Sequence, residues 1–265
     1  FPPDKIDLPP WRDDEFDESA PERNRVLHHM LGVREDRIED VYGMMGVYYG
    51  MVRQIDDALG RMLDALERLG LREDTIVVFC SDHGDFMGEH AMQCKGGAFY
   101  DCLTRVPLVI SWPGVVPAGV RDGSMANLVD IMPTLFALQG IEIPKAMHGR
   151  ALSTVTDEAP RDVTFSEYGA GGPAFTLDDL HAVPQPWGRR TLIDSLQARE
   201  AEGRRKMART TDWKYVHDPM GDKDELYDLH ADPWELRNVV DEPENASAKA
   251  DMALRLADWS IATED

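Results

Sequence analysis

The sequence predicts an α/β domain with a mixed or parallel sheet flanked by helices, followed from about residue 163 by a smaller α+β subdomain. Two observations predict the first part: a long segment of helical periodicity, and an uninterrupted β-rich run that follows it after a short turn. A third observation predicts the subdomain, because short alternating segments there precede an amphipathic one. With 265 residues, 43% of them hydrophobic, the chain is long enough to bury a core.

The helical segment covers residues 37–69. Its apolar side chains recur at spacings of three and four, and they are Tyr42, Met45, Tyr49, Val52, Ile55, Leu59, Met62, Leu63 and Leu66. Gly70 is suited to end the helix after its last turn. We interpret this apolar face as part of the core and not as a set of cofactor contacts.

The β-rich run at residues 76–80 predicts a strand buried on both faces, as in a parallel sheet. Residues 107–112 predict a second strand, which Pro113-Gly114 ends, and residues 127–138 predict a helix. In open α/β sheets, ligands bind beyond the carboxyl ends of the strands. The residues directly after Cys80 are therefore the first place to expect chemistry.

The two ends of the chain differ in character. Residues 1–36 are predicted to be an irregular linker, because residues 1–22 are rich in proline and acidic side chains. The glycine-containing stretch 159–190 predicts a loop with little regular structure. Beyond it, short alternating segments predict a small antiparallel sheet, at residues 206–210, 214–217 and 225–229. Residues 246–261 predict an amphipathic helix.

The composition is acidic, with 28 Lys and Arg against 49 Asp and Glu and a net charge of −21. This balance argues against a nucleic acid as the main partner, because binding phosphates along a backbone needs a basic face. An anionic small substrate stays compatible, since a bound divalent metal can dominate the local field. No apolar stretch approaches the roughly 20 residues of a membrane span, so we expect no membrane partner.

The three cysteines, Cys80, Cys94 and Cys102, lack the spacing of a disulfide framework. We interpret them as free thiols, which fits a reducing compartment, although one pair could still form a bridge. The chain does not begin with Met and opens without the pattern of a signal peptide. We interpret it as a piece of a longer protein. The free cysteines favour a cytoplasmic location, and periplasmic and secreted locations stay open because the start of the parent chain is not visible.

The strongest local feature is Asp82 beside His83, directly after the predicted strand. A carboxylate and an imidazole can both coordinate one divalent cation; the carboxylate suits calcium, and the imidazole suits manganese or zinc better. Gly84 then permits an unusual backbone angle. Taken alone, the triplet equally fits a capping Asp and a surface His.

Lys95 is the second candidate, because it lies among small residues beyond the strand that carries Asp82 and His83. A lysine at this place could neutralise charge on a tetrahedral anion during group transfer. The alternative interpretation is an exposed loop lysine.

Taken together, these segments resemble the sulfatase family of the alkaline-phosphatase superfamily, from about residue 39 to the C-terminus. The metal-binding segment of that family is similar to Ser81-Asp82-His83-Gly84-Asp85-Phe86-Met87-Gly88-Glu89-His90. Its Lys-Gly…Tyr…Arg-x-Pro stretch is similar to Lys95-Gly96, Tyr100 and Arg105-Val106-Pro107. Its later signatures resemble Asp130-Ile131-Met132-Pro133-Thr134-Leu135, Gly149-Arg150, Trp213-Lys214-Tyr215, Glu225-Leu226-Tyr227-Asp228-Leu229 and Asp232-Pro233-Trp234-Glu235.

The resemblance implies a sulfatase-like mixed sheet, with residues 1–162 as the C-terminal part of the catalytic domain and residues 163–265 as a smaller subdomain. It implies that Asp82 and His83 are metal ligands. Lys95 would be the catalytic residue that contacts sulfate or phosphate oxygens and the leaving group, and His90 could line the same pocket. One divalent metal ion is implied, Ca²⁺ first, with Mn²⁺ or Mg²⁺ as alternatives because of His83.

The nucleophile of the family is a formylglycine, made from the Cys of a Cys-x-Pro/Ala-x-Arg motif. None of the three cysteines fits: after Cys102 the arginine comes one position early and no Pro or Ala stands second. We therefore expect the formylglycine upstream, in the remainder of the parent chain, and expect this chain alone to be inactive. In the implied mechanism a hydroxyl of the hydrated aldehyde attacks sulfur or phosphorus, while Lys95 stabilises the charge.

The implied function is hydrolysis of a sulfate ester of a small molecule or glycan. A second interpretation is a phosphonate or phosphate mono- or diester hydrolase on the same scaffold, because many sulfatases have Asn where this chain has His83. A third is a non-catalytic fragment or binding subunit that lacks the nucleophile. The presence of Asp82, His83 and Lys95 together argues against the third.

Overall fold

The computed structural model describes residues 1–33, 38–156, 158–172, 176–182 and 203–264. The chain forms two compact units, and each is built from separate stretches of sequence. Unit 1 comprises Phe1–Leu8, Glu35–Gly84 and Arg105–Asp162. Unit 2 comprises Pro9–Arg34, Asp85–Thr104 and Val163–Asp265. None of the described helices is long and apolar enough to cross a membrane.

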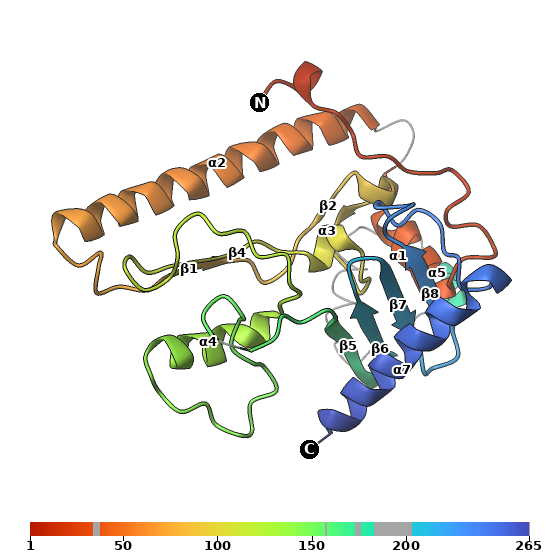
Figure 1. The fold of residues 1–265 in the computed structure, drawn as a ribbon. Helices are drawn as coiled ribbons and strands as arrows, with labels where there is room; N and C mark the ends of the chain where they lie inside the picture. Colours follow the sequence, from red (N-terminus) through yellow and green to blue (C-terminus); the bar gives the residue numbers. More distant parts are fainter. Residues whose placement is uncertain (34–37, 157, 173–175, 183–202, 265) are drawn as a thin grey trace. The chain divides into compact units, whose positions relative to one another are not determined.

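Unit 1 contains one long helix, a two-stranded sheet and a short helix (Figure 1). Its elements are η1 (Pro3–Lys5), α2 (Ile38–Arg68), β1 (Val77–Cys80), β4 (Leu108–Ser111), η4 (Leu128–Asp130) and α4 (Ile131–Leu138). The two strands are antiparallel, with Val77 opposite Ser111 and Cys80 opposite Leu108. The predicted helices and strands of this part of the chain are thereby confirmed.

Helix α2 has the length that its periodicity predicts, but most of its apolar face is not core. Val41 and Met45 are buried, whereas residues farther along the same face, such as Val52 and Ile55, are exposed. The expectation that this whole face is buried is therefore wrong for the chain described here. Further large apolar side chains of unit 1 are exposed as well, among them Leu71, Val109, Val115, Val120, Val129, Met132 and Ile141.

Strand β1 also differs from its prediction. Val77, Val78 and Phe79 are half-buried and Cys80 is exposed, where burial on both faces was expected. The physical reason is the small sheet: among the described residues β1 pairs with β4 alone, and that pairing is antiparallel. A two-stranded sheet has no inner strand that neighbours could cover on both sides.

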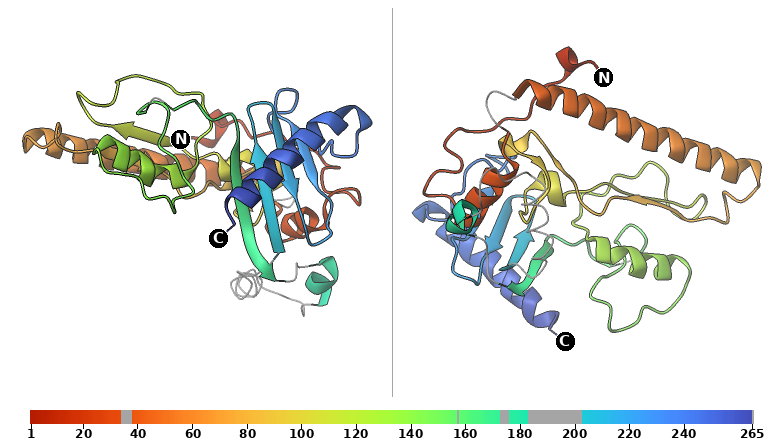
Figure 2. Two further views of the ribbon diagram at one scale, coloured as in Figure 1. Left: turned by 60° about the horizontal axis from the view of Figure 1, so that its bottom comes forward. Right: turned by 180° about the vertical axis from the view of Figure 1, so that it is seen from behind.

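Unit 2 is built around a four-stranded antiparallel sheet in the order β5-β6-β7-β8. These strands are β5 (Thr164–Gly172), β6 (Gly203–Arg209), β7 (Trp213–His217) and β8 (Glu225–Asp228). Helix α7 (Ala246–Ala262) packs across β6 and β7, as the views in Figure 2 show. The core between them includes Ala208, Tyr215, Leu226, Met252 and Leu256. The predicted antiparallel sheet and C-terminal helix are confirmed.

Earlier segments of the chain pack within unit 2. They form α1 (Glu22–Leu31), β2 (Phe86–Met87), η3 (Glu89–Ala91), β3 (Gln93–Cys94) and α3 (Asp101–Thr104), and α5 (Leu177–Ala182) and η5 (Pro243–Asn245) complete the unit. A second core joins Leu27 and Leu31 of α1 to Phe86, Tyr100 and Tyr227. Unit 2 therefore includes segments that precede residue 162, where the sequence predicted the boundary between two domains. The two predicted domains stay a prediction.

Two expectations of irregular backbone are wrong. Helix α1 lies inside the predicted linker of residues 1–36, because Val26, Leu27 and Leu31 place apolar side chains on one buried face. Strand β5 lies inside the predicted loop of residues 159–190, where its backbone pairs with β6. That pairing uses main-chain groups, so the glycines that suggested a loop do not prevent it. Residues 173–175 and 183–190 of the predicted loop lie outside the described residues.

Candidate functional site

Asp82 and His83 lie in unit 1, immediately beyond the carboxyl end of β1. The turn that presents them is fixed by two hydrogen bonds. The hydroxyl of Ser81 donates to the carbonyl oxygen of His83 at 2.9 Å, and the backbone N–H of His83 donates to Oδ1 of Asp82 at 3.0 Å. The side chain of Asp82 is 84% exposed and that of His83 is 38% exposed. Both side chains are therefore accessible from solvent.

The imidazole of His83 is oriented by the backbone. Its Nδ1 lies 2.9 Å from the carbonyl oxygen of Gly84. A carbonyl only accepts, so Nδ1 carries a proton, and in the neutral imidazole the lone pair is then on Nε2. This Nε2 lies 3.4 Å from Oδ2 of Asp82. Two ligands about 2.0–2.4 Å from one ion and roughly at right angles to each other lie about 3 Å apart, so the pair fits a shared cation.

This pair is an incomplete ligand set. No group of three or more His, Cys, Asp or Glu that could hold a metal ion occurs in the part of the chain that the structure describes. Hard divalent cations take six or more ligands, and structural zinc takes four. Asp82 and His83 can thus contribute two donors to a metal centre, with the second donor oriented by Gly84 as metal-binding histidines usually are.

Lys95 lies in unit 2, in the loop of residues 95–97 that follows β3; we call this segment the Lys95 loop. The Lys95 side chain is exposed. A Cβ added to Gly96 would lie 2.2 Å from Leu27 of α1, and one added to Gly97 would lie 2.5 Å from the ring of Tyr168 of β5. Both approaches are closer than any side chain permits. The two glycines therefore let the Lys95 loop lie directly against α1 and β5.

His90, the other predicted substrate contact, lies in the core of unit 2 and is 2% exposed. Its Nδ1 contacts Oε1 of Glu15, and its ring stacks on Tyr100 with centroids 3.7 Å apart. The backbone at His90 has a φ of 56°, which few non-glycine residues adopt. This geometry gives no support to direct contact with substrate and instead makes His90 part of the packing around Tyr100.

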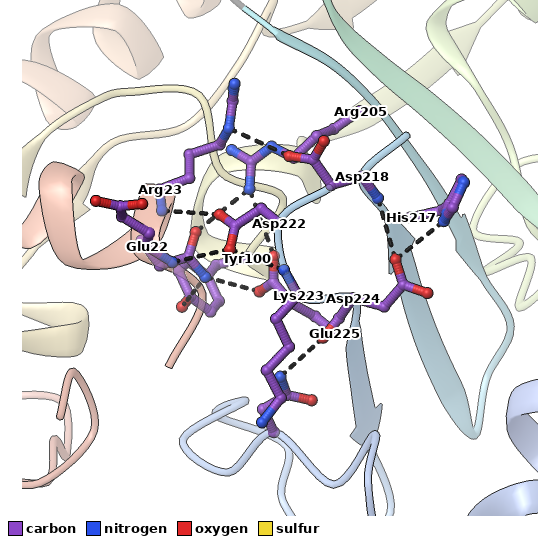
Figure 3. A network of polar contacts seen from close by, with 12 residues as sticks. Glu22, Arg23, Tyr100, Arg205, His217, Asp218, Asp222, Lys223, Asp224 and Glu225 are labelled. Carbon is purple, nitrogen blue, oxygen red and sulfur yellow. Dashed lines mark hydrogen bonds and ion pairs between the residues drawn. The ribbon is translucent and has the colours of Figure 1, made fainter. Parts of the chain in front are cut away.

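A buried polar network extends from Tyr100 to the sheet of unit 2 (Figure 3). The side-chain amide of Asn24 donates to the hydroxyl of Tyr100 at 3.2 Å and to Glu225 at 2.8 Å. Tyr227 donates to the same carboxylate at 2.6 Å, and Arg205 forms an ion pair with it at 3.4 Å. Burial raises the pKa of Tyr100 and Tyr227 well above the usual value, so both hydroxyls keep their protons. The network is therefore a structural support within unit 2 and not a source of acid–base chemistry.

The network also holds α1. The carboxylate of Asp222 accepts the backbone N–H groups of Glu22 and Arg23 at 3.0 and 2.9 Å, which satisfies two donors at the start of this helix (Figure 3). The guanidinium of Arg23 in turn lies 3.4 Å from Asp218. Through these contacts the hairpin between β7 and β8 fixes the helix against which Gly96 packs.

The segment around Asp130 has a structural role within unit 1. Its carboxylate accepts the backbone N–H of Asn127 at 2.7 Å and that of Arg150 at 2.9 Å. Arg161 donates two further bonds to it, at 2.7 and 2.9 Å. A Cβ at Gly149 would lie 2.1 Å from the carbonyl oxygen of Val129, so the two segments meet backbone to backbone.

The three cysteines are free, as predicted. Cys102 is half-buried, and burial raises the pKa of its thiol far above the ordinary value. A thiol that stays protonated is a weak nucleophile, which agrees with the interpretation of Cys102 as a packing residue.

Sequence and structure comparisons identify similar proteins. The model of the family described as Sulfatase matches residues 2–141. Choline-sulfatase of Rhizobium meliloti (strain 1021) is 30% identical over 262 residues, which cover 94% of this chain and 44% of that protein. Arylsulfatase K of Homo sapiens is 30% identical over 204 residues, covering 76% of this chain and 34% of that protein. The chain thus spans less than half the length of these curated relatives.

Two solved structures are similar as well. The phosphonate monoester hydrolase of Agrobacterium radiobacter is 31% identical with a TM-score of 0.69, over 86% of this chain and 43% of that one. The phosphonate monoester hydrolase SpPMH from Silicibacter pomeroyi is 26% identical with a TM-score of 0.77, over 99% of this chain and 52% of that one. The fold is therefore shared with enzymes named for sulfate esters and for phosphonate esters.

Proposed function

The chain belongs to the sulfatase family, and we propose that it is part of a metal-dependent enzyme that hydrolyses a sulfuric ester. The observation that carries this proposal is the geometry of Asp82 and His83, whose Oδ2 and Nε2 atoms lie 3.4 Å apart beyond the end of β1. The names of the relatives choline-sulfatase and arylsulfatase K support the sulfate ester of a small molecule as substrate. A relative named N-acetylglucosamine-6-O-sulfatase supports a glycan sulfate as well.

In this proposal Asp82 presents a carboxylate oxygen and His83 presents Nε2 to one divalent cation, while the Gly84 carbonyl keeps the imidazole in the required tautomer. When bound, such an ion supplies Lewis-acid polarisation of the ester oxygens. The carboxylate favours Ca²⁺, which we propose first; the imidazole keeps Mn²⁺ and Mg²⁺ as alternatives. The further ligands would come from the remainder of the parent chain.

Lys95 is the proposed catalytic residue of this chain. Its ammonium would donate to the oxygens of the transferred group and to the leaving oxygen, where negative charge develops in the transition state. The close packing of Gly96 and Gly97 supports this role, because it gives the lysine a fixed backbone. His90 would act by packing on Tyr100, and not by contact with the substrate.

The nucleophile, a formylglycine, would come from the remainder of the parent chain. The exposed apolar side chains of unit 1, such as Val52 and Ile55, support a longer parent, because apolar faces of this kind mark surfaces that another part covers. The share of the relatives' length that this chain spans, 44% for choline-sulfatase, agrees with that. We propose that the sheet of β1 and β4 and the outer face of α2 pack against the missing part.

A phosphonate or phosphate ester is the second candidate for the substrate. His83 favours it, together with the similarity to two phosphonate monoester hydrolases with TM-scores of 0.69 and 0.77. Both substrates share a tetrahedral centre with several charged oxygens, so Asp82, His83 and Lys95 would serve either reaction.

The test uses the complete protein and compares turnover of 4-nitrophenyl sulfate with that of 4-nitrophenyl phenylphosphonate. We expect higher kcat/KM on the sulfate, and equal or higher kcat/KM on the phosphonate would contradict the first choice. Peptide mass mapping of the same protein should find a formylglycine within a Cys-x-Pro/Ala-x-Arg segment. A complete protein without that motif, and without turnover of either ester, would instead be a binding subunit.

A further inference from the structure

Lys214 of β7 is fully buried and holds the backbone that follows the Lys95 loop. Its Nζ donates to the carbonyl oxygen of Phe99 and to Oδ1 of Asp101, each at 2.7 Å. The same ammonium forms an ion pair with Glu235. One buried cation of the C-terminal sheet thus holds the segment that begins four residues after Lys95.

The two carboxylates hold the same segment. Glu235 accepts the backbone N–H of Asp101 at 2.5 Å, and Arg209 of β6 donates to both carboxylate oxygens of Asp101, at 2.9 and 2.7 Å. Glu235 adopts a φ of 60°, in the left-handed region that side chains rarely occupy. Burial would raise the pKa of Asp101, but the hydrogen bonds from Arg209 and the charge of Lys214 lower it to about 2. Asp101 therefore stays charged between its two cations.

The cluster pairs charges and also holds main-chain atoms. Desolvation of a buried ion pair typically offsets its attraction, and apolar replacements of such pairs are often neutral or stabilising. Here a fully buried lysine and a strained glutamate both act on main-chain atoms of residues 99 and 101. These contacts fix the backbone of residues 99–101, which follow Gly96 and Gly97 in the sequence.

We propose that Lys214, together with Asp101 and Glu235, is a positioning residue that orients Lys95 toward the transferred group of the substrate. This inference rests on the proposed function of Lys95. It gives the C-terminal sheet a part in catalysis without contact with the substrate, because the sheet fixes the backbone from which Lys95 projects.

The test measures kcat and KM of the complete protein with 4-nitrophenyl sulfate, and with 4-nitrophenyl phenylphosphonate as a second probe. Lys214→Met removes the charge at similar length, and kcat should fall at least about tenfold while KM changes less than about threefold. Lys206→Met is the matched control, because Lys206 lies on the neighbouring strand and contacts Ser260 and Trp259 of α7. The control should leave both constants within about twofold of wild type.

Hydrogen exchange supplies a readout that does not depend on turnover. The amides of residues 96–104 should exchange at least about tenfold faster in Lys214→Met than in wild type or in Lys206→Met, because a buried restraint on this backbone is lost. Glu235→Gln keeps an acceptor for the Asp101 N–H and removes a charge. If Lys214→Met does not fold, Glu235→Gln tests the positioning role in its place. For Glu235→Gln we expect kcat to fall at least about threefold and the same amides to exchange faster.

The outcomes separate the two claims. If Lys95→Ala leaves turnover unchanged, the proposed function of Lys95 is wrong. If Lys95→Ala abolishes turnover while the folded variants among Lys214→Met and Glu235→Gln keep the wild-type kcat and exchange, the positioning role is wrong and the proposed function stands.

Discussion

Asp101 is a carboxylate of unit 2 that two cationic side chains hold in its charged form. Its carboxylate lies between Arg209 and Lys214, and its pKa falls from the ordinary value of 3.8 to about 2. The lower pKa means that the folded state holds the charged form more favourably than the unfolded state does. A stabilising contribution of about 2 kcal/mol follows from a shift of this size.

This contribution should depend on pH. It is fully present above the unfolded pKa of 3.8, is lost as the pH falls through about 2, and is absent below that value. We expect the stability difference between wild type and Asp101→Asn to shrink by about 2 kcal/mol between pH 5 and pH 2. Urea unfolding of both proteins across that range measures it. A stability difference that stays constant across this range would contradict the argument.

The candidate metal ligands were predictable from sequence because Asp82 and His83 are neighbours in the chain and follow a recognisable strand. The long-range contacts of unit 2 were not predictable. Glu15 meets His90 across 75 residues, and Glu235 meets the Asp101 backbone across 134. A contact between such distant residues has no local pattern, and nothing in the sequence around Glu15 distinguishes it from the solvated acidic residues beside it.

At the scale of elements, the segment from η4 to α4 depends on one close backbone contact. Gly149 packs against the carbonyl oxygen of Val129, beside the carboxylate of Asp130 that binds Asn127 and Arg150. The hydrogen bonds of Asp130 and the absence of a Cβ at Gly149 thus both hold residues 149–150 close to residues 127–130. A side chain at that glycine would force the two segments apart.

Gly149→Ala should therefore destabilise the protein by about 1–3 kcal/mol, the usual cost of overpacking. Gly123→Ala is the control in the same unit, because a Cβ there meets nothing within 4 Å. Thermal unfolding of the two variants measures the difference. Equal melting temperatures for both would show that the backbone at Gly149 can move without cost.

The elements whose apolar side chains recur with the period of a helix or a strand were predicted correctly. The elements that depend on backbone hydrogen bonds to distant segments were not. Helix α2 and strands β6, β7 and β8 carry the period of their structure in their side chains. Strand β5 ends in the glycine-rich run from which a loop was predicted, yet it pairs with β6 from Thr164 onward. Helix α1 was not predicted because acidic and proline-rich sequence precedes it. The carboxylate that binds its first N–H groups belongs to Asp222, in a hairpin about 200 residues away in the sequence.

At the scale of the whole molecule, the exposed apolar side chains of unit 1 are the main departure from an ordinary folded surface. The period of α2 predicts a buried face, and Ile55 on that face is 54% exposed. Periodicity reports which side chains are suited to burial, but it does not report what buries them. The difference is explained if the remainder of a longer sulfatase chain covers this face.

Substitution of one residue on this face tests that explanation. Ile55→Asp should destabilise the complete protein by at least about 2 kcal/mol, because a buried apolar side chain would be replaced by a charge. Leu254→Asp is the control, since Leu254 is 61% exposed on α7 of unit 2. If both substitutions change the unfolding midpoint equally little, the α2 face is a solvent surface in the complete protein as well.

The central claim is that Asp82 and His83 bind a divalent metal ion. Its most direct measurement is the metal content of the complete protein after dialysis, determined for wild type, Asp82→Asn, His83→Ala and the control His217→Ala. The control histidine lies at the end of β7 in unit 2, where it is half-exposed and contacts Asp224. We predict one tightly held divalent ion in wild type and in His217→Ala, and its loss from Asp82→Asn and His83→Ala. Full metal content in all four proteins would contradict the assignment of these two residues as ligands.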